Sequence, residues 1–394
     1  MDKIQEILNR GVANIIPNKA ELEKILRSDK KLNIYLGIDP TATKIHLGHA
    51  VPLRKLQAFA ELGHNVIFLI GDFTALIGDT SDKDSERPSL TPEQIEQNFK
   101  DYKRQAEKIL DFSKIQIKHN SEWLEKLTFA EIIKLTQHFS FGDFASRELI
   151  KKRLTDGKHV GLHEALYPVM QGYDSYIMDT DLQLGGTDQT FNMQAGRTLQ
   201  KDLRNKESFV LSNAFLTGTD GAKMSKTGGN AIWLDDKAEE MYGKIMSIKD
   251  GLIIEYFTLA TKIELPEIEK INARIKSGEN PLNIKKELAF KIVSELHSQE
   301  QANKAQEYFE KTVQNKEIPE ELETLNININ ENLTVVDILA NNKIVPSRSE
   351  AKRLIEQGGL EADNNVVKDI YFKPQKGQHY LRIGKRRFLK ITLS

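Results

Sequence analysis

Residues 34–62 constrain the fold most, because an apolar strand pattern passes through a short polar loop into a helical pattern. The run Ile34 to Ile38 has the length and character of a short buried strand. From Val51 to Leu62, apolar residues recur at helical spacing. The intervening Asp39-Pro40-Thr41 cannot easily continue a strand. The sequence therefore predicts a strand, a loop and a helix in succession.

Two histidines lie where this helix is expected to begin, in His46-Leu47-Gly48-His49. Unpaired backbone N–H groups and the positive end of the helix dipole favour an anion at such a position. Gly48 has no side-chain bulk, so a ligand could lie against the backbone there. Taken alone, the segment is better explained by an ordinary strand-to-helix turn that carries two surface or cap histidines.

A second polar segment, Lys223-Met224-Ser225-Lys226-Thr227, lies in a glycine-rich stretch that can bring two cations to a phosphate chain. By itself, a pair of lysines in a loop is typical of a solvated surface. Together, the histidine and lysine segments resemble the two signature motifs of class I aminoacyl-tRNA synthetases, in the same order and at about the expected separation. The segments described below extend the resemblance over nearly the whole chain. Within the family, the chain is similar to the bacterial tyrosyl-tRNA synthetases.

Length and composition favour a soluble protein of several domains. A chain of 394 residues with 39% hydrophobic and 29% charged residues is too long for one compact core of typical size. The longest apolar runs are too short to span a bilayer, and the N-terminus predicts an amphipathic helix and no signal peptide. We therefore expect a cytoplasmic protein that does not contact a membrane. The absence of cysteine excludes disulfides and cysteine-ligated metal.

The first half of the chain predicts an α/β fold. From Leu32 to about Leu216, short β-like runs alternate with helical stretches, as in a doubly wound parallel sheet. We expect a Rossmann-like catalytic domain over residues 1–220, with helices over residues 1–30 and a helical insertion at about 120–160.

The second half predicts two further domains. Residues 221–320 contain the lysine segment and then purely helical periodicity, which the resemblance identifies as an all-helical anticodon-binding domain. Residues 321–331 are expected to be a linker. Residues 332–394 combine two short helical patterns, a glycine turn and short strands, and they resemble a small α+β RNA-binding domain of the S4 type.

The C-terminal domain is basic. Residues 331–394 carry 12 Lys or Arg against 7 Asp or Glu, in a chain whose net charge is −1. Such an excess favours a polyanionic partner. The cations singled out for contact with RNA phosphates are Arg348, Lys352, Arg353, Lys385, Arg386 and Arg387. A merely solvated basic face is the alternative.

Three further segments carry polar residues in informative positions. Tyr167, Gln171 and Asp174 fall on one face of a predicted helix whose other positions are apolar, so a ligand or an internal hydrogen-bond network must satisfy them. Asp188 and Gln189 follow a short strand and a Gly-Gly turn, at the edge where open α/β sheets bind nucleotides. A long polar loop from Gly71 to Pro88 carries two cations four residues apart, although a surface loop would explain it equally well.

The resemblance assigns these residues to three groups. The catalytic group, expected to contact the phosphates of ATP, is Thr41, His46, His49, Lys83, Arg87, Lys223, Lys226 and Thr227. The group expected to bind tyrosine is Tyr35, Asp79, Tyr167, Gln171, Asp174 and Gln189. The group expected to bind ATP is Gly37, Asp39, Gly48, Asp188 and Lys226.

The activity implied by the resemblance is ligation of L-tyrosine to tRNA(Tyr). ATP would be a substrate and Mg²⁺ would accompany it, without a metal bound by the protein itself. The attacking carboxylate is already an anion, so the enzyme needs alignment and charge neutralisation and no nucleophilic Ser or Cys. The resemblance also implies a homodimer. Two alternatives stay open: a tryptophanyl-tRNA synthetase, and a non-catalytic RNA-binding protein on a synthetase scaffold.

Overall fold

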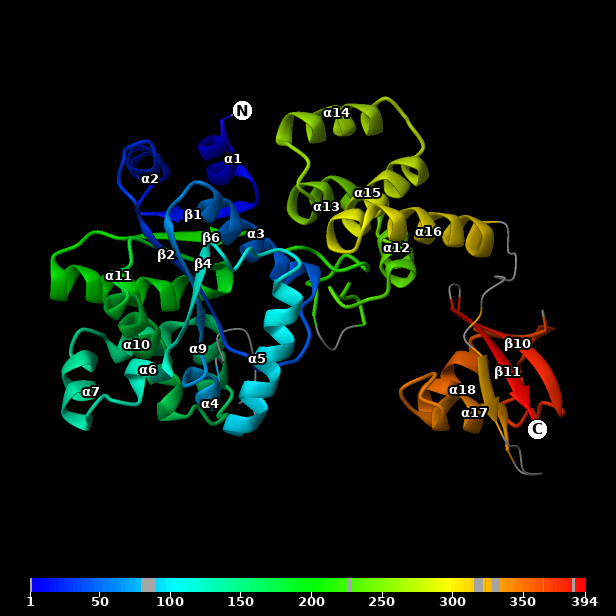
Figure 1. Cartoon of the computed structure of the whole chain (residues 1–394). Coiled ribbons are helices and arrows are strands. Elements are labelled where there is room, and N and C mark those ends of the chain that lie inside the picture. The colour runs from blue at the N-terminus through cyan, green and yellow to red at the C-terminus, as the bar shows by residue number, and fades with distance from the viewer. Residues whose placement is uncertain are drawn as a thin grey trace. The chain divides into compact units, whose positions relative to one another are not determined.

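The computed structural model describes residues 2–78, 90–225, 229–314, 322, 324–327, 333–363, 365–384 and 387–394, without the side chain of Arg387. The chain forms two compact units (Figure 1). The first unit is Met1–Asp236 with Ser247–Leu296, and the second is Lys237–Met246 with His297–Ser394. The predicted boundaries at residues 220 and 320 stay predictions.

A six-stranded sheet with the order β1-β6-β5-β2-β3-β4 forms the centre of the first unit. Its strands are β1 (Val12–Ile16), β2 (Asn33–Ile38), β3 (Asn65–Ile70), β4 (Ile115–His119), β5 (Leu182–Gly186) and β6 (Phe209–Asn213). Strands β2 to β6 pair in parallel, whereas β1 pairs antiparallel with β6. The chain extends the sheet from β2 first in one direction and then in the other. This is a doubly wound sheet, and it confirms the predicted fold class.

Helices surround this sheet (Figure 1). In chain order they are α1 (Lys3–Asn9), α2 (Lys19–Leu26), α3 (Leu47–Glu61), α4 (Thr74–Ile77), α5 (Pro92–Ala106), α6 (Ser121–Leu124), α7 (Phe129–Thr136), α8 (Phe141–Ser146), α9 (Glu148–Thr155), α10 (Leu162–Ile177), the 3₁₀ turn η1 (Thr187–Gln189) and α11 (Thr190–Arg204). α3 is the helix predicted after the first strand, and its side chains Leu53, Leu56 and Phe59 are fully buried. The predicted helical insertion consists of the short helices α6 to α9.

The expectation that residues 1–30 are helical is wrong for β1. α1 and α2 form as expected, but between them Val12–Ile16 pair with β6, from Val12 opposite Asn213 to Ile16 opposite Val210. A five-residue strand with little alternation carries a weak local signal. Its hydrogen-bond partners come from a strand far away in the sequence, so pairing within the folded sheet decides its conformation.

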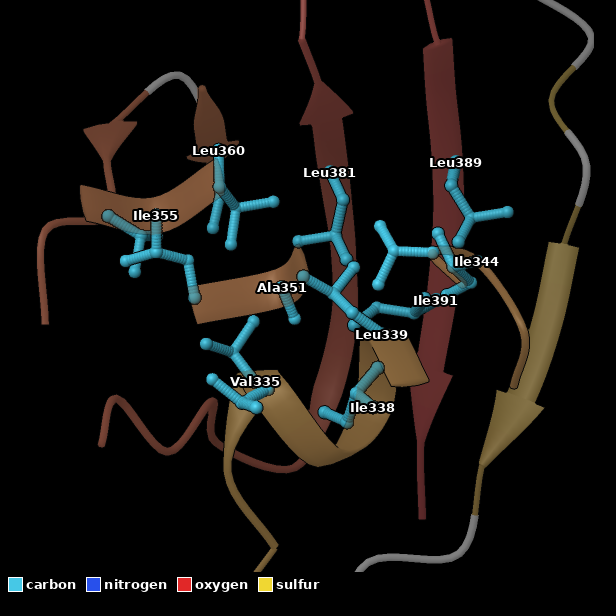
Figure 2. Packing of buried hydrophobic residues seen from close by; sticks show 14 of the residues in the cluster. Val335, Ile338, Leu339, Ile344, Ala351, Ile355, Leu360, Leu381, Leu389 and Ile391 are labelled. Carbon is cyan, nitrogen blue, oxygen red and sulfur yellow. The ribbon is translucent and has the colours of Figure 1, made fainter. Parts of the chain in front are cut away.

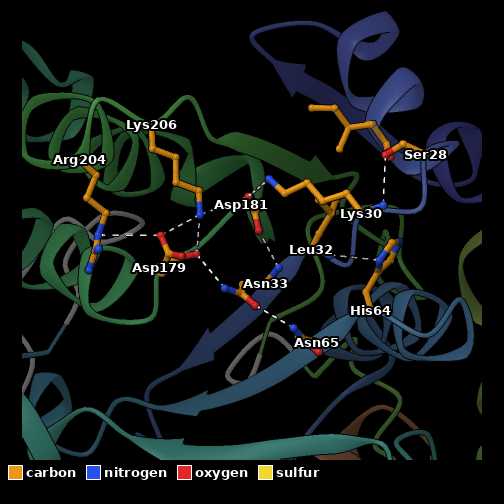
Figure 3. A network of polar contacts seen from close by, with 11 residues as sticks. Ser28, Lys30, Leu32, Asn33, His64, Asn65, Asp179, Asp181, Arg204 and Lys206 are labelled. Carbon is orange, nitrogen blue, oxygen red and sulfur yellow. Dashed lines mark hydrogen bonds and ion pairs between the residues drawn. The ribbon is translucent and has the colours of Figure 1, made fainter.

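A network of polar groups fixes the amino-terminal ends of three parallel strands (Figure 3). Just before β5, the Asp181 carboxylate accepts hydrogen bonds from the Asn33 backbone N–H at 2.9 Å and from Lys30 Nζ at 2.8 Å. The Asn33 side chain in turn accepts a hydrogen bond from Asn65 Nδ2, at the start of β3, at 3.1 Å. Structural hydrogen bonds thus occupy this edge of the sheet, and a ligand site is expected at the opposite, carboxyl-terminal edge.

The second segment of the first unit, Ser247–Leu296, is helical, as predicted. The turn η2 (Asp250–Leu252) is followed by α13 (Ile253–Ala260), α14 (Leu265–Lys276) and α15 (Pro281–Leu296). Phe257, Leu288 and Ile292 are among their fully buried residues. In the second unit, α12 (Ala238–Met246) packs against α16 (Gln299–Phe309), which continues into the π-helical turn η3 (Glu310–Gln314). No helix in the described ranges has the length and apolarity to cross a membrane.

The C-terminal part of the second unit is a small α+β module, as predicted. A sheet of order β7-β11-β10-β8-β9 carries two helices. These elements are β7 (Thr324–Ile327), α17 (Val335–Asn341), α18 (Arg348–Glu356), β8 (Leu360–Ala362), β9 (Asn365–Val366), β10 (Gly377–Ile383) and β11 (Arg387–Leu393). Figure 2 shows side chains of both helices, such as Leu339 and Ile355, meeting Leu381 and Ile391 of the sheet in one buried core. β7 lies within the segment expected to be a linker, where Leu325 and Ile327 pack against this core.

Candidate functional site

A cavity of about 770 Å³ lies at the carboxyl-terminal edge of the first unit's sheet, against the ends of β2 and β5. Here the direction in which the chain extends the sheet reverses, and open α/β sheets bind their ligands at such a point. The predicted catalytic, tyrosine-binding and ATP-binding residues within the described ranges all line this cavity. They are Tyr35, Gly37, Asp39, Thr41, His46, Gly48, His49, Tyr167, Gln171, Asp174, Asp188, Gln189 and Lys223.

The remaining predicted residues, Asp79, Lys83, Arg87, Lys226 and Thr227, lie outside the described residues. The structure thus brings together predicted site residues from four separate segments of the sequence, namely residues 35–49, 167–174, 188–189 and Lys223. The chemical role of each stays a prediction.

The two histidines are fixed at the start of α3. His46 is the N-cap residue, and its backbone N–H donates to His49 Nδ1 at 3.4 Å. The two rings stack with their centroids 3.7 Å apart and an interplanar angle of 18°. A Cβ on Gly48 would lie 3.0 Å from the His46 ring, so a side chain at this position would require the imidazole to shift. The imidazoles and the first turn of α3 therefore form one rigid wall of the cavity.

The loop that carries Thr41 is held by α5. Gln105, which is fully buried, accepts a hydrogen bond from the Ile45 backbone N–H at 2.9 Å and donates to the Thr43 carbonyl at 2.6 Å. Asn98 Nδ2 donates to the Pro40 carbonyl at 2.8 Å. Since buried polar groups are costly to leave unpaired, these side chains specify the path of the loop.

Lys223 lines the same cavity from a loop that follows β6. Its Nζ lies 3.8 Å from the Asp188 carboxylate and 4.4 Å from the centre of the Phe215 ring. The loop is braced by Asn230, whose Nδ2 donates to the Lys223 carbonyl at 3.2 Å and whose Oδ1 accepts from the Ser225 N–H at 3.1 Å. A cation and two imidazoles therefore face the same space, as binding of a polyphosphate requires.

The predicted amino-acid pocket contains a buried carboxylate. Asp174 is 3% exposed, and it accepts hydrogen bonds from Trp123 Nε1 at 2.7 Å and from Asn120 Nδ2 at 3.2 Å. Burial raises the pKa of Asp174 to about 7, against the effect of these two hydrogen bonds. Burial and the nearby Asp174 carboxylate raise the pKa of the Tyr35 phenol well above its ordinary value, so this hydroxyl stays protonated.

A second carboxylate, Asp39, organises the centre of the cavity. It accepts hydrogen bonds from the Tyr167 hydroxyl and from the Thr74 hydroxyl, both at 2.8 Å. Gly71 passes so close that a Cβ there would overlap Asp39 Oδ1 and Thr74 Oγ1. Residue 71 must therefore lack a side chain for Asp39 and Thr74 to occupy these positions.

Comparison with known proteins identifies this architecture. The sequence model described as "tRNA synthetases class I (W and Y)" matches residues 27–314, well over half of the chain, and the S4 domain model matches residues 334–379. The chain belongs to the class I tRNA synthetases.

Individual relatives agree with this family. The chain is 43% identical over 390 residues to the tyrosine–tRNA ligase of Thermotoga maritima, across 98% of this chain and 96% of that protein. It is 43% identical over 397 residues to the tyrosine–tRNA ligase of Carboxydothermus hydrogenoformans, across 98% and 97%. Among solved structures, the tyrosyl-tRNA synthetase of Archaeoglobus fulgidus, complexed with L-tyrosine, matches with a TM-score of 0.62 at 22% identity, across 77% of this chain and 100% of that chain. At that identity the structural match supports the fold alone.

Several residues that shape this synthetase cavity were not predicted. Asn120 and Trp123 hold Asp174, Thr74 holds Asp39, and Gln183 accepts the Tyr35 hydroxyl at 3.0 Å. Gln183 did carry a signal, because it is a polar residue inside an apolar strand. Asn120 directly follows β4, at the edge of the sheet that holds the other site residues.

Three of the six predicted RNA-binding cations, Arg348, Lys352 and Arg353, lie on α18 at exposed positions. Arg348 forms an ion pair with Asp337, and Arg353 forms one with Glu350 at 2.7 Å, while Lys352 is exposed beside them. Lys385, Arg386 and the side chain of Arg387 lie outside the described residues. The three described cations thus belong to one helix, and their contact with RNA stays a prediction.

Proposed function

We propose that this class I synthetase is a tyrosine–tRNA ligase. It would activate L-tyrosine with ATP and then transfer the tyrosyl group to the 3′ end of tRNA(Tyr). The observation that carries the proposal is the convergence of His46, His49 and Lys223 on one cavity that also contains the buried Asp174 carboxylate. The near full-length similarity to proteins named tyrosine–tRNA ligase supports the same choice.

In the first step, a carboxylate oxygen of tyrosine attacks the α-phosphorus of ATP. A bond forms between this oxygen and phosphorus, the bond from the α-phosphorus to the bridging oxygen breaks, and pyrophosphate leaves with the electron pair. No proton has to be removed, so the protein acts by alignment and by charge neutralisation. Mg²⁺ bound to the ATP phosphates would supply part of that neutralisation.

Several residues at the phosphate end of the cavity would together supply this alignment and charge neutralisation. His46 and Thr41 would bind the departing phosphates, and Lys223 would approach them from the loop that follows β6. Lys83, Arg87, Lys226 and Thr227 complete the clamp in this proposal. Gly48 would leave room for the nucleoside, while Asp188 and Asp39 would accept hydrogen bonds from ribose and nearby substrate groups. Interactions that strengthen only as pyrophosphate separates raise the rate of the chemical step.

Selection of tyrosine would depend on Asp174. The substrate phenol would donate a hydrogen bond to this carboxylate, with the Tyr35 hydroxyl on its other side, while Tyr167 and Gln171 would hold the α-ammonium group. Phenylalanine would leave the buried carboxylate without this donor, which costs free energy. An indole would offer its N–H at a different position, so the arrangement also disfavours tryptophan.

Transfer to tRNA would involve the rest of the chain. The ribose hydroxyl oxygen at the 3′ end of the tRNA forms a bond with the tyrosyl carbonyl carbon, and the bond from this carbon to the phosphate oxygen breaks. AMP leaves with the electron pair, and the hydroxyl proton passes to the phosphate or to solvent. Cations of α18 in the S4 module would bind tRNA phosphates. By analogy with its family, we also propose that the protein is a cytoplasmic homodimer.

ATP–pyrophosphate exchange with each amino acid in turn tests this function. We expect exchange with tyrosine, and a Lys223→Ala variant should lose most of it while Lys201→Ala, on the exposed side of α11, retains it. Exchange with tryptophan in place of tyrosine would identify a tryptophanyl-tRNA synthetase. Exchange with no amino acid, combined with RNA binding, would identify the non-catalytic alternative.

A further inference from the structure

Helix α13 holds the base of the loop that carries Lys223. Both backbone polar groups of Thr217 are bound by side chains of this helix. Glu255 Oε1 accepts the Thr217 N–H at 2.6 Å, and the Tyr256 hydroxyl donates to the Thr217 carbonyl at 2.8 Å. Tyr256 is fully buried, and burial together with Glu255 raises the pKa of its phenol, so the hydroxyl stays protonated as a donor. The side chains of Glu255 and Tyr256 thus satisfy the backbone N–H and carbonyl of Thr217, which would otherwise need hydrogen-bond partners elsewhere.

Thr217 is coupled to Lys223 through the backbone. The two residues face each other in an antiparallel bridge, and the Gly218 N–H donates to the Ala222 carbonyl at 2.7 Å within the turn that joins them. The position of Thr217 therefore sets the position of the Lys223 backbone. The Lys223 side chain extends from there to within 3.8 Å of Asp188 in the cavity.

The other end of α13 is bound to α3, the helix that begins at the two histidines. Arg54 of α3 donates to the carbonyl of Ala260, the last residue of α13, at 2.8 Å. The same guanidinium forms an ion pair with Glu295 of α15 at 2.8 Å, with both side chains mostly buried. Arg10 donates to the next carbonyl, that of Thr261, at 2.8 Å. Cations at the carbonyl end of a helix satisfy its unpaired acceptors and its dipole.

We propose that α13 sets the distance between the Lys223 loop and the histidine end of α3, and that Glu255 and Tyr256 are positioning residues for the activation step. The inference rests on the proposed function and deepens it. Neither residue lines the cavity. Both act on the phosphate chain chiefly through Lys223, because their hydrogen bonds end at Thr217, which pairs with Lys223.

Tyr256→Phe removes the hydroxyl and keeps the buried ring. Loss of one buried hydrogen bond at the loop base should lower kcat/KM for ATP in tyrosine-dependent pyrophosphate exchange about tenfold. The dissociation constant for tyrosine, measured in the absence of ATP, should not change. Tyr242→Phe, at a fully buried tyrosine of the second unit, is the matched control and should retain normal exchange. Normal exchange by Tyr256→Phe, or an equal loss in Tyr242→Phe, would overturn the inference.

A double-mutant cycle separates positioning from general destabilisation. If Tyr256 acts through Lys223, Tyr256→Phe should have little further effect in a Lys223→Ala background. The full tenfold loss in that background would contradict the mechanism.

The two variants of Glu255 give a second, independent test that does not depend on the folding of Tyr256→Phe. Glu255→Gln keeps a side-chain acceptor for the Thr217 N–H and should retain exchange, whereas Glu255→Leu cannot accept and should lose it. Equal activities of these two variants would also overturn the inference. If the wild-type protein exchanges with no amino acid, the proposed function itself fails, which is a different result from an active protein with unaffected variants.

Discussion

Replacing Asp174 by asparagine should stabilise the first unit at pH 8 and have almost no effect at pH 5. Burial raises the pKa of this carboxyl from 3.8 to about 7. Between these two values the folded state keeps a proton that the unfolded state has released, so the free energy of unfolding falls as pH rises through this window. Above pH 7 the full cost of the buried charge is present, about 4 kcal/mol at 1.36 kcal/mol per pH unit.

Asparagine avoids this cost, but it loses one hydrogen bond. Trp123 Nε1 and Asn120 Nδ2 both donate to Asp174, and an amide can accept only through its oxygen. Its NH₂ group must then face one of the two donors, at a cost of about 1–2 kcal/mol. At pH 8 the variant should therefore be more stable by about 3 kcal/mol, whereas at pH 5 the two effects should nearly cancel.

Urea unfolding of both proteins from pH 5 to pH 8, followed by tryptophan fluorescence, measures this difference. Trp123 and Trp233 are the two tryptophans of the chain and both lie in the first unit, so the signal reports on the unit that contains Asp174. Asp143→Asn, at an exposed position, is the control for loss of an acidic residue. A stability difference between Asp174→Asn and wild type that is the same at pH 5 and pH 8 would refute the argument. The stabilised variant should also lose its preference for tyrosine over phenylalanine in pyrophosphate exchange.

One further substitution addresses the cavity, and one truncation addresses the S4 module. Gly71→Ala places a Cβ against Asp39 Oδ1 and Thr74 Oγ1, and should cost about 1–3 kcal/mol of stability and weaken tyrosine binding. Gly251→Ala, whose Cβ would meet no atom within 4 Å and whose backbone does not have a positive φ, controls for the added methyl group in the calorimetric measurement. Normal tyrosine affinity in Gly71→Ala would contradict the packing described for Asp39. Removal of residues 333–394 should leave pyrophosphate exchange unchanged and reduce tRNA charging. The remaining tRNA charging should depend less on salt concentration than charging by the full chain does. Loss of exchange as well would mean that this module is required for the activation site.

The sequence predicted those parts of the molecule that depend on local patterns. Alternating strand-like and helical runs were sufficient for the doubly wound sheet, because each crossover helix carries its own apolar periodicity. The spacing of Tyr167, Gln171 and Asp174 placed them on one face of α10, and all three line the cavity. The small module was predicted for the same reason, since its two helices and its core strands are locally patterned.

Residues whose role depends on distant partners escaped prediction. β1 has a weak pattern of its own and is specified by pairing with β6. Asn120 and Trp123 precede Asp174 by more than forty positions, and nothing near them in the sequence indicates a buried carboxylate. The contacts of α13 with Thr217 and with Arg54 likewise join segments that are separate in the sequence. Tertiary contact, which a single sequence does not contain, decides each of these.

A crystal structure of the protein with a non-hydrolysable analogue of tyrosyl-adenylate tests the central claim most directly. The account predicts that the phenol oxygen lies within hydrogen-bonding distance of Asp174, that the nucleoside packs against Gly48, and that the phosphate group faces the space beside His46 and Lys223 where pyrophosphate would leave. A ligand bound elsewhere, or bound in this cavity with its aromatic ring away from Asp174, would contradict the account.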